Sequence, residues 1–486
     1  MTDDNNSAKT DNFDLIVIGA GPVGENIVDR AIQGGLTAAT IERELVGGEC
    51  SYWACMPSKA LLRAPMALRA AHALPGAAQA ITGGIDAAAL FEHRDRVIHH
   101  FHDHGQVQWL EELGSELIRG HGRLSGERTV TVTKPDGNIR VLHARSAVAL
   151  ATGTIAAIPD IPGLRAVRPW TSREATTATT VPPRLVIIGG GVVASEMATA
   201  FAGLGSAVTL LIRTQLLSAF EPFAGELVGD ALHALGVEVR TDSPASVTRH
   251  ANGTIAVTLA SGEILEADEI LAATGRAPHT DDLGLDTVGL TPGSWLSVDD
   301  TLRVLDKDDT PIAWLYGVGD VNRRALLTHQ GKYQARAVGD VIVARSSGAD
   351  VKDAPWGAHV ATADHESVPQ VVFTDPEVAS VGLTAAAAEK AGYRIRVIDY
   401  DLGAIAGASL TAVGYHGTAR MIVDDERKIV LGATFVGKEV GELLHSATIA
   451  IVGEVPLSRL WHAVPSYPTI SEIWLRLLEA YGRDSA

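Results

Sequence analysis

Residues 13–24 read FDLIVIGAGPVG, a short apolar run followed by a glycine-rich segment. Residues 13–18 form a continuous apolar run, which is typical of a parallel strand buried on both faces. Gly19, Gly21 and Gly24 follow at once in the order G-x-G-x-x-G. The first glycine permits a tight turn, the second lets a pyrophosphate approach backbone N–H groups, and the third lets a helix pack on the strand. The helix N-terminus then faces the anion, so the stretch predicts a dinucleotide-binding βαβ unit.

An acidic residue completes this first fingerprint. A second predicted strand at residues 37–41 ends in Glu42, which lies 21 positions after Gly21. A carboxylate at this place accepts hydrogen bonds from ribose hydroxyls. We therefore expect Glu42 to bind the first nucleotide.

The same pattern recurs later in the chain. Residues 184–188, RLVII, lead into Gly189, Gly191 and Ala194 of the sequence GGGVVA, with a helical stretch and a second strand behind them. Two fingerprints imply two dinucleotides. Arg213 follows the second strand, where the first copy has an acid, and a guanidinium binds a 2′-phosphate. This favours NADPH over NADH. The alternative is that Arg213 is an ordinary surface residue and that other residues select the nucleotide.

Other strands end on polar residues that suit a cofactor. Two matched segments each end in Thr-Gly. They are residues 148–153 (VALATG), which end in Thr152–Gly153, and residues 270–275 (ILAATG), which end in Gly275. Residues 314–320, WLYGVGD, end in Asp320, whose carboxylate would hold a polar cofactor chain. Alternating stretches at 419–423 and 430–436 predict an antiparallel sheet in a further domain that starts near residue 357.

Composition sets limits on the class of protein. The 486 residues are 46% hydrophobic and 20% charged, which is typical of a globular protein of several domains. A net charge of −18 argues against nucleic-acid and anionic-membrane partners. The first 12 residues show no signal-peptide pattern, and the weakly charged stretch 185–211 is broken by glycines and Glu196. We expect no membrane span and a cytoplasmic protein.

The chain has two cysteines, in residues 47–59, GGECSYWACMPSK. Cys50 and Cys55 are too close in sequence for a structural cross-link, so they are either inert thiols or a redox pair. Pro57 fits the opening turn of a helix, and a helix N-terminus favours the thiolate. A zinc site would need further ligands, and no other cysteine is present.

This segment resembles the active-site signature of the flavin disulfide reductases, the class I pyridine nucleotide-disulfide oxidoreductases. The group contains dihydrolipoamide dehydrogenase, glutathione reductase and mercuric reductase. GAGPVG, the two ATG segments, GVGD and VVFTDPEVASVGLT all occur in the order that the family has. The resemblance implies an α/β homodimer with two Rossmann-like domains, for FAD and NAD(P), and a C-terminal α+β dimerisation domain. The predicted limits are 1–12 for a disordered tail, 13–165 with 286–356 for FAD, 166–285 for NAD(P), and 357–486 for the interface.

The resemblance also implies roles for single residues. Cys50 would be the interchange thiol that faces the substrate, and Cys55 the charge-transfer thiol against the flavin. Lys59 would lie beside the flavin and pair with Glu196, where it would stabilise negative charge on the reduced ring. Asp320 would bind the ribitol region, and Gly48 would lie at the cofactor. Electrons would pass from NADPH, or NADH, through FAD and the dithiol to a small-molecule acceptor.

One signature departs from the family. In the family, a C-terminal H-P-T-x-x-E motif supplies a histidine base from the other subunit. Residues 467–472 of this chain read YPTISE, so Tyr467 stands where the family has histidine and Glu472 matches the motif's acid. A phenol with an ordinary pKa of about 10 is a poor proton acceptor at neutral pH. We therefore expect an acceptor that needs no imidazole: a quinone, an activated disulfide or another electrophile. His445 and His462 are expected to be structural or surface residues.

Two other functions stay open. Mercuric reductases also have a tyrosine here, but they carry a C-terminal cysteine pair that residues 479–486 lack. A dihydrolipoamide dehydrogenase-like component of a multienzyme complex is the other alternative, against which the absence of a lipoyl-type domain and flexible linker counts. Five histidines between His93 and His104 lie on what the sequence predicts as one long helix at 86–113. We expect a solvated helical face and no metal site there.

Overall fold

The computed structural model describes residues 11–483. The chain forms two compact units of three segments each: the first holds residues up to Tyr52, Ile98–Ile155 and Arg276–His365, and the second holds Trp53–Val97, Ala156–Gly275 and residues from Glu366 onward. Most of the predicted disordered tail, 1–12, lies outside the described residues, and Asn12 begins the first strand. Residues 53–97, which the predicted limits give to the FAD domain, belong to the second unit.

The first unit is built on an eight-stranded sheet. The order β16-β17-β6-β1-β2-β3 is parallel from β17 to β3, and β16 and the β4–β5 hairpin add antiparallel strands. Leu15, Ile16 and Val17 are fully buried, as the apolar run predicts. The strands are β1 (Asn12–Ile18), β2 (Ala38–Glu42), β3 (Glu116–Arg119), β4 (His121–Gly126), β5 (Thr129–Thr133), β6 (Ile139–Leu150), β16 (Arg303–Leu305) and β17 (Pro311–Gly317).

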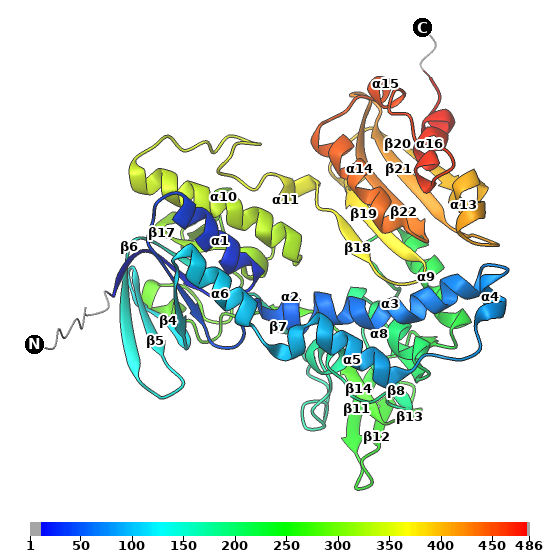
Figure 1. The fold of residues 1–486 in the computed structure, drawn as a ribbon, viewed down its shortest axis with the longest axis horizontal. Coiled ribbons are helices and arrows are strands. Elements are labelled where there is room, and N and C mark those ends of the chain that lie inside the picture. The colour runs from blue at the N-terminus through cyan, green and yellow to red at the C-terminus, as the bar shows by residue number, and fades with distance from the viewer. Residues whose placement is uncertain (1–10, 484–486) are drawn as a thin grey trace, which may run out of the picture. The chain divides into compact units, whose positions relative to one another are not determined.

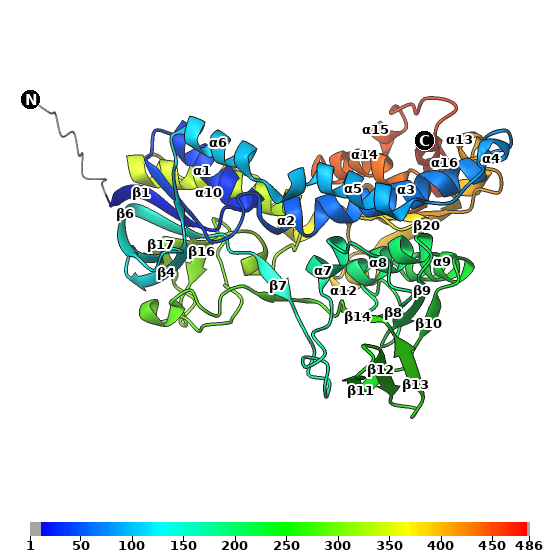
Figure 2. The same ribbon diagram turned by 60° about the horizontal axis from the view of Figure 1, so that its bottom comes forward.

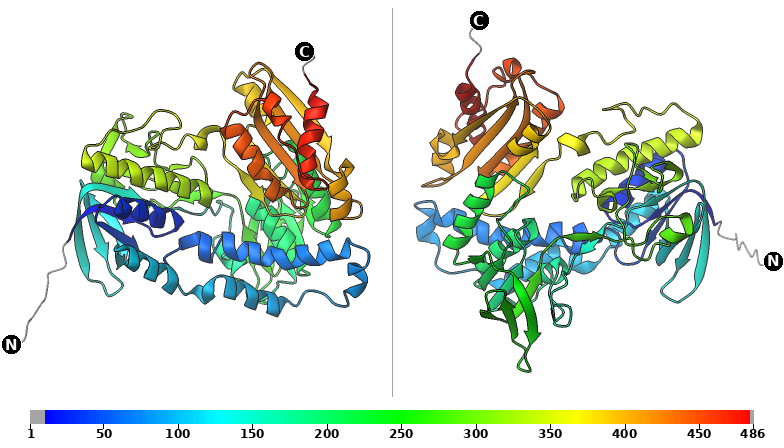
Figure 3. Two further views of the ribbon diagram at one scale, coloured as in Figure 1. Left: turned by 45° about the horizontal axis from the view of Figure 1, so that its top comes forward. Right: turned by 180° about the vertical axis from the view of Figure 1, so that it is seen from behind.

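Two helices lie side by side in this unit (Figures 1 and 3). They are α1 (Pro22–Gln33), which follows the first glycine turn, and α10 (Thr328–Ser347). Gly339 permits their close approach, because a Cβ there would lie 2.4 Å from the Cβ of Arg30. Arg30 in turn donates from Nε to Asp340 at 2.9 Å. The glycine and this ion pair therefore fix how the two helices pack.

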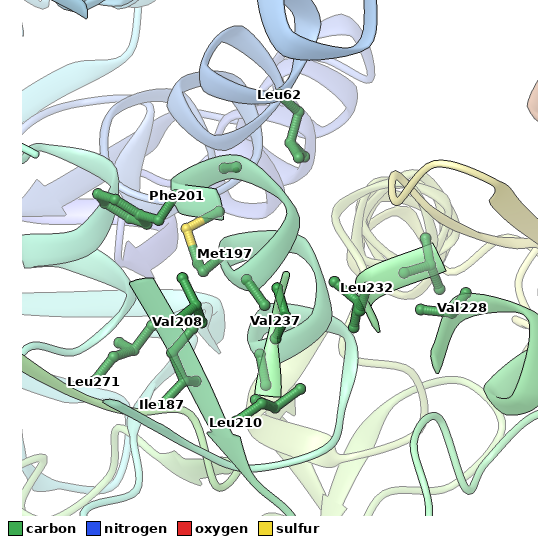
Figure 4. Packing of buried hydrophobic residues seen from close by; sticks show 14 of the residues in the cluster. Leu62, Ile187, Met197, Phe201, Val208, Leu210, Val228, Leu232, Val237 and Leu271 are labelled. Carbon is green, nitrogen blue, oxygen red and sulfur yellow. The ribbon is translucent and has the colours of Figure 1, made fainter. Parts of the chain in front are cut away.

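The second unit contains another parallel sheet, in the order β10-β9-β8-β14 (Figure 2). Figure 4 shows its core, in which Ile187, Leu210 and Leu271 of the sheet lie near Met197 and Phe201 of α8. The antiparallel sheet β11-β12-β13 completes this region. The elements are α7 (Ser172–Thr176), β8 (Arg184–Ile188), α8 (Val192–Gly203), β9 (Ala207–Leu211), α9 (Pro222–Ala234), β10 (Glu238–Arg240), β11 (Pro244–Arg249), β12 (Ile255–Leu259), β13 (Ile264–Ala267) and β14 (Glu269–Ala272).

The same unit carries a five-stranded antiparallel sheet, in the order β18-β19-β22-β21-β20. The predicted stretches 419–423 and 430–436 fall in its β21 and β22, so the prediction of an antiparallel sheet is confirmed. Helix α14 packs on β19 and β22, and α16 packs on β20 and β21. The elements are β18 (Gln370–Val372), β19 (Glu377–Gly382), β20 (Ile395–Asp401), β21 (Thr418–Asp424), β22 (Ile429–Gly437), α14 (Val440–Val452) and α16 (Ile473–Tyr481).

The remaining helices and strands lie between these elements along the chain. They are α2 (Gly48–Tyr52), α3 (Cys55–His72), α4 (Ala77–Ala80), α5 (Ala87–Val97), η1 (His99–Phe101), α6 (His104–Leu113), β7 (Thr154–Ala156), β15 (Arg276–Pro278), η2 (Leu285–Val288), η3 (Gly319–Asn322), α11 (Ala363–Glu366), α12 (Ala385–Lys390), η4 (Leu402–Ala404), α13 (Ala406–Thr411), α15 (Leu457–Leu460) and η5 (Ile470–Glu472). Among residues 11–483, none of the helices has the length and apolar composition needed to cross a bilayer.

The prediction of one helix at 86–113 is wrong. Helix α5 ends at Val97, and His99, His100 and Phe101 take left-handed φ values of 52°, 51° and 60° before α6 begins. A run of such residues cannot continue a right-handed helix, and histidine tolerates this region better than most residues. The break falls where the chain passes from the second unit to the first. In the part of the chain that the structure describes, no group of three or more potential ligands could hold a metal ion.

Candidate active site

The first glycine turn has the geometry of a cradle for a dinucleotide. Gly19 has φ +102°, and a Cβ there would lie 2.5 Å from the carbonyl oxygen of Ala151. A Cβ on Gly24 would lie 1.9 Å from the Gly19 oxygen, so α1 could not pack on β1 with any other residue. Gly21 is the N-cap of α1. Gly48 has φ +56° and lies against Gly21, so that a Cβ on Gly48 would be 2.9 Å from the Gly21 Cα. The four glycines thus leave backbone N–H groups approachable at the helix start, which fits FAD.

Glu42 ends β2 and holds this turn in shape. Its Oε2 accepts from the Ala20 N–H at 2.8 Å and its Oε1 from the Glu44 N–H at 2.7 Å. A carboxylate has about four acceptor positions, so two remain for ribose hydroxyls. Glu42 therefore lies where the sequence predicts a nucleotide-binding acid, and it also fixes the glycine turn.

Asp320 lies in η3, directly after β17. Its Oδ2 accepts from the Thr154 hydroxyl at 2.8 Å, and Arg276 donates from Nε to the same hydroxyl at 2.6 Å. Burial raises the pKa of the Asp320 carboxyl, against the hydrogen bond from Thr154. On the neighbouring turn, the Thr152 hydroxyl donates to the His279 carbonyl at 2.9 Å and Gly153 has φ +69°. These groups form a polar edge at the end of the first sheet.

A buried network that the sequence did not reveal supports the Asp320 turn. The side-chain oxygen of Gln334 accepts from the Gly319 N–H at 2.7 Å and from the Asn322 amide at 2.8 Å. The amide nitrogens of Gln330 and Gln334 donate to the two carboxyl oxygens of Asp364, at 2.9 and 2.8 Å. Burial raises the pKa of Asp364. The network therefore ties α10 and α11 to the residues on both sides of Asp320.

The second glycine turn repeats the first in the second unit. Gly189 has φ +138°, and a Cβ there would lie 2.2 Å from the Ala273 oxygen. Gly191 is the N-cap of α8 and faces open space, as does Gly275 at φ +136°. Ala194 is buried in the first turn of α8. Arg213, two residues beyond β9, is exposed, and the turn fits a second dinucleotide.

Lys59 and Glu196 form an ion pair within the second unit. Lys59 Nζ of α3 lies 2.8 Å from Glu196 Oε2 of α8, and the other carboxylate oxygen accepts from the Phe373 N–H at 2.9 Å. The Glu196 side chain is 4% exposed and that of Lys59 35%. The ammonium also lies 4.9 Å from the centre of the Phe373 ring. The carboxylate is thus satisfied on both oxygens, and the ammonium keeps one open side.

The two cysteines belong to different units. Cys50 lies in α2 of the first unit, and the chain passes to the second unit between Tyr52 and Trp53. Cys55 is the first residue of α3, with Pro57 in the opening turn as predicted. Both cysteines are partly buried. Cys55 therefore lies at the N-terminal end of an 18-residue helix, the position that the sequence predicts for it.

The C-terminal signature lies in the last part of the second unit. Tyr467 is 76% exposed, and the peptide bond between it and Pro468 is cis. Glu472 is buried and accepts from Arg476 at 2.7 Å. His445 and His462 are both exposed. The tyrosine side chain is therefore presented on the surface of its own chain.

Residues 13–348 match the family described as pyridine nucleotide-disulphide oxidoreductase, and residues 368–477 match its dimerisation domain. The chain is 32% identical to mercuric reductase of Shigella flexneri over 480 residues, which are 97% of this chain and 81% of that protein. It is also 32% identical over 480 residues to dihydrolipoyl dehydrogenase of Haloferax volcanii, covering 96% and 95% of the two chains. 

A solved structure shares the fold. The Cu(II) complex of the HOCl-induced flavoprotein disulfide reductase RclA from Escherichia coli matches with a TM-score of 0.81 and 21% identity, covering 96% of this chain and 99% of that one. The dimerisation-domain match indicates a homodimer. The predicted fold class, with two Rossmann-like regions and a C-terminal dimerisation domain, is thus confirmed. The chain belongs to the pyridine nucleotide-disulphide oxidoreductase family.

Proposed function

We propose that this protein is an FAD-dependent oxidoreductase that takes electrons from NADPH and passes them through a Cys50–Cys55 disulfide to a small electrophilic acceptor. The two glycine turns at Gly19 and Gly189 carry the proposal, since each is closed to any side chain and opens a helix. A protein with two dinucleotide sites is suited to moving electrons between them. The expected location is the cytoplasm.

Bound FAD would supply hydride acceptance and two-electron transfer. The first unit would hold it through the turn of Gly19, Gly21 and Gly24, with Glu42 at the ribose and Asp320 at the ribitol chain. The polar edge of Thr152 and Gly153, and the close approach at Gly48, would complete that site. The second unit would hold the nicotinamide nucleotide through Gly189, Gly191, Ala194 and Gly275, with Arg213 at a 2′-phosphate.

Side chains of the second unit and the two cysteines would then stabilise the charge on the flavin and carry out the thiol–disulfide exchange. The Lys59 ammonium, oriented by Glu196, would stabilise negative charge on the flavin. Two electrons and two protons would convert the Cys50–Cys55 disulfide into two thiols, and oxidation of the pair by the acceptor would restore the disulfide. Cys50 would attack or bind the acceptor, and Cys55 would face the flavin.

Tyr467 supports an acceptor that needs no imidazole base. An exposed phenol donates a hydrogen bond but does not take a proton at neutral pH. In a homodimer Tyr467 would be presented to the partner's thiols, and Glu472 of the same motif would assist it. Quinones and activated disulfides accept electrons without strong base assistance, which makes them the favoured class.

A thiophilic metal ion is the second candidate acceptor. The relatives include mercuric reductases, and a solved structure of the same fold is a Cu(II) complex. The chain's two cysteines would have to receive the ion directly, because no other cysteine is present in the sequence. A metal-ion reductase would also have no need of the histidine base.

Turnover with a set of acceptors distinguishes these possibilities. NADPH oxidation should be measured with a quinone, an aryl disulfide, lipoamide, glutathione disulfide and Hg²⁺, in the wild type and in Cys50→Ser. Rapid quinone or aryl-disulfide reduction that is lost in Cys50→Ser supports the proposal. Brisk lipoamide reduction contradicts the argument from Tyr467, and quinone reduction unaffected by Cys50→Ser contradicts the role of the disulfide.

A further inference from the structure

Helix α7 contacts the short segment that joins the two cysteine-bearing helices, α2 and α3. Only Trp53 and Ala54 separate α2 from α3. The Thr176 hydroxyl lies 2.8 Å from the Trp53 carbonyl oxygen and 2.9 Å from that of Ser172, so its single proton is shared between these two acceptors. The Arg173 guanidinium carbon lies 4.3 Å from the centre of the Trp53 ring. Both contacts come from α7, one to the backbone and one to the side chain. Together they restrain Trp53, which is two residues before Cys55.

Helix α7 is only five residues long, yet it is fixed at both ends. At its start, the Thr171 hydroxyl and N–H donate to the Glu174 carboxylate at 2.6 and 2.7 Å. Burial raises the pKa of Glu174, but these bonds outweigh it and hold the pKa below the ordinary value. Ala175 in the middle of the helix is fully buried in the core.

The other end of α7 is held by a buried cation. Arg94 of α5 is 1% exposed, and its Nη1 donates to the carbonyls of Thr176 and Ala178 at 2.8 and 2.9 Å. Asp95 balances its charge with an ion pair of 2.7 Å. A cation at the last carbonyls of a helix satisfies acceptors that lack partners and complements the helix dipole. Helix α7 is therefore a rigid support.

We propose that Arg173 and Thr176 are positioning residues for the redox pair, acting through Trp53 on the start of α3 and hence on Cys55. This rests on the redox role of Cys55 proposed above. The contacts of Arg173 and Thr176 with Trp53 keep the first turn of α3 formed, so that Cys55 stays at the helix N-terminus where its thiolate is stabilised. Without these contacts that turn frays, and the midpoint pH of the Cys55 alkylation reaction rises.

The test measures Cys55 directly in the flavin-loaded protein. The protein is reduced with dithiothreitol, and iodoacetamide alkylation of Cys55 is followed by mass spectrometry between pH 5 and 10. In Thr176→Val the midpoint of reactivity should move up by at most about one pH unit, which is the shift if the whole free energy of one hydrogen bond reached the thiol. Arg173→Met should shift it in the same direction, and Thr176→Ser should restore the wild-type value.

Thr199→Val is the matched control. Thr199 is buried to a similar degree, and its hydroxyl donates to the Ser195 carbonyl of its own helix at 2.8 Å. Its alkylation midpoint should equal that of the wild type. If Thr176→Val and Arg173→Met both keep the wild-type midpoint, the positioning role is wrong. Failure of the proposed function looks different: reduced wild-type protein would then show no electron exchange between Cys55 and the flavin, whatever the midpoints.

Discussion

Glu196 binds Lys59 with one carboxylate oxygen, at 2.8 Å, and the backbone of Phe373 with the other, at 2.9 Å. Three segments far apart in sequence thus meet at one buried carboxylate: α3, which begins with Cys55, α8, which follows the second glycine turn, and the residue after β18. A buried charge that has partners on both oxygens costs little, whereas one that loses its cation is destabilising. The ion pair therefore fixes the side of α3 that carries Lys59.

Removing the cation tests this arrangement. Lys59→Met leaves the Glu196 carboxylate buried with a single backbone donor, so the free energy of unfolding should fall by about 1–3 kcal/mol, less than for a fully buried pair because Lys59 is partly exposed. Urea unfolding measures the change. The control is Glu92→Gln, which removes an exposed pair with Arg96 at 3.9 Å and should change the value by no more than about 0.5 kcal/mol. Equal losses in the two variants would contradict the account.

Gln334 should control how tightly FAD is held. Gln334→Met removes the acceptor for the Gly319 N–H and the Asn322 amide, on both sides of Asp320. The dissociation constant of FAD should rise roughly tenfold, as expected for leaving buried donors unpaired. Fluorescence of released flavin measures it. Gln330→Met loses only a bond to Asp364, so it should change the constant much less, and an equal change would argue against the role of Gln334.

Glu25 should make stability depend on pH. Burial of this carboxyl in the first turn of α1, aided by Glu42 and opposed by Lys332, raises its pKa from the ordinary 4.5 to about 7. One carboxylate oxygen is buried without a hydrogen-bond partner among the described residues. Between pH 4.5 and about 7 the folded protein binds the proton more tightly than the unfolded chain, so stability falls as pH rises.

The neutral variant isolates this effect. Glu25→Gln should be more stable than the wild type at pH 8, by up to about 3 kcal/mol, and the difference should shrink toward zero at pH 4. Urea unfolding at the two pH values measures it. A constant difference between the two proteins across this range would show that Glu25 does not titrate as described.

Arg213 should decide between NADPH and NADH. Arg213→Glu replaces a cation at the end of the second strand with an acid, and the ratio of kcat/KM for NADPH over NADH should fall roughly ten- to hundredfold. Arg43→Glu is the control, since Arg43 is also an exposed arginine close behind a strand, one residue after β2, but lies in the first unit. In Arg43→Glu the ratio of kcat/KM for NADPH over NADH should stay at the wild-type value. An unchanged ratio in Arg213→Glu would place the choice of nucleotide elsewhere.

The parts that the sequence predicted are those with local physical causes. Gly19 and Gly189 need positive φ and lie against a neighbouring backbone, so they appear as glycines at fixed spacing. The Gln334 network was not predicted, because Asp364 and Gly319 are 45 residues apart and no periodicity links them. The break at His99 was missed for a different reason: left-handed residues other than glycine leave no clear signal, and the chain changes unit there.

Trp53 shows the same limit at the candidate site. The motif around Cys50 and Cys55 predicts a redox pair from sequence alone. The contacts to Trp53 come from Arg173 and Thr176, more than a hundred residues later, and depend on a buried Arg94 that nothing in the local sequence distinguishes from a surface residue. Residues that position a site through tertiary contacts are visible only in the folded chain.

An anaerobic titration of the purified protein with NADPH shows whether electrons pass from the flavin to the Cys50–Cys55 disulfide. We expect bound FAD and, after two electrons, a long-wavelength absorbance from the Cys55 thiolate against oxidised flavin. The same titration of Cys55→Ser should lack this band and reduce the flavin at once. Direct bleaching of the flavin in the wild type, with no long-wavelength band and both cysteines unchanged, would contradict the account.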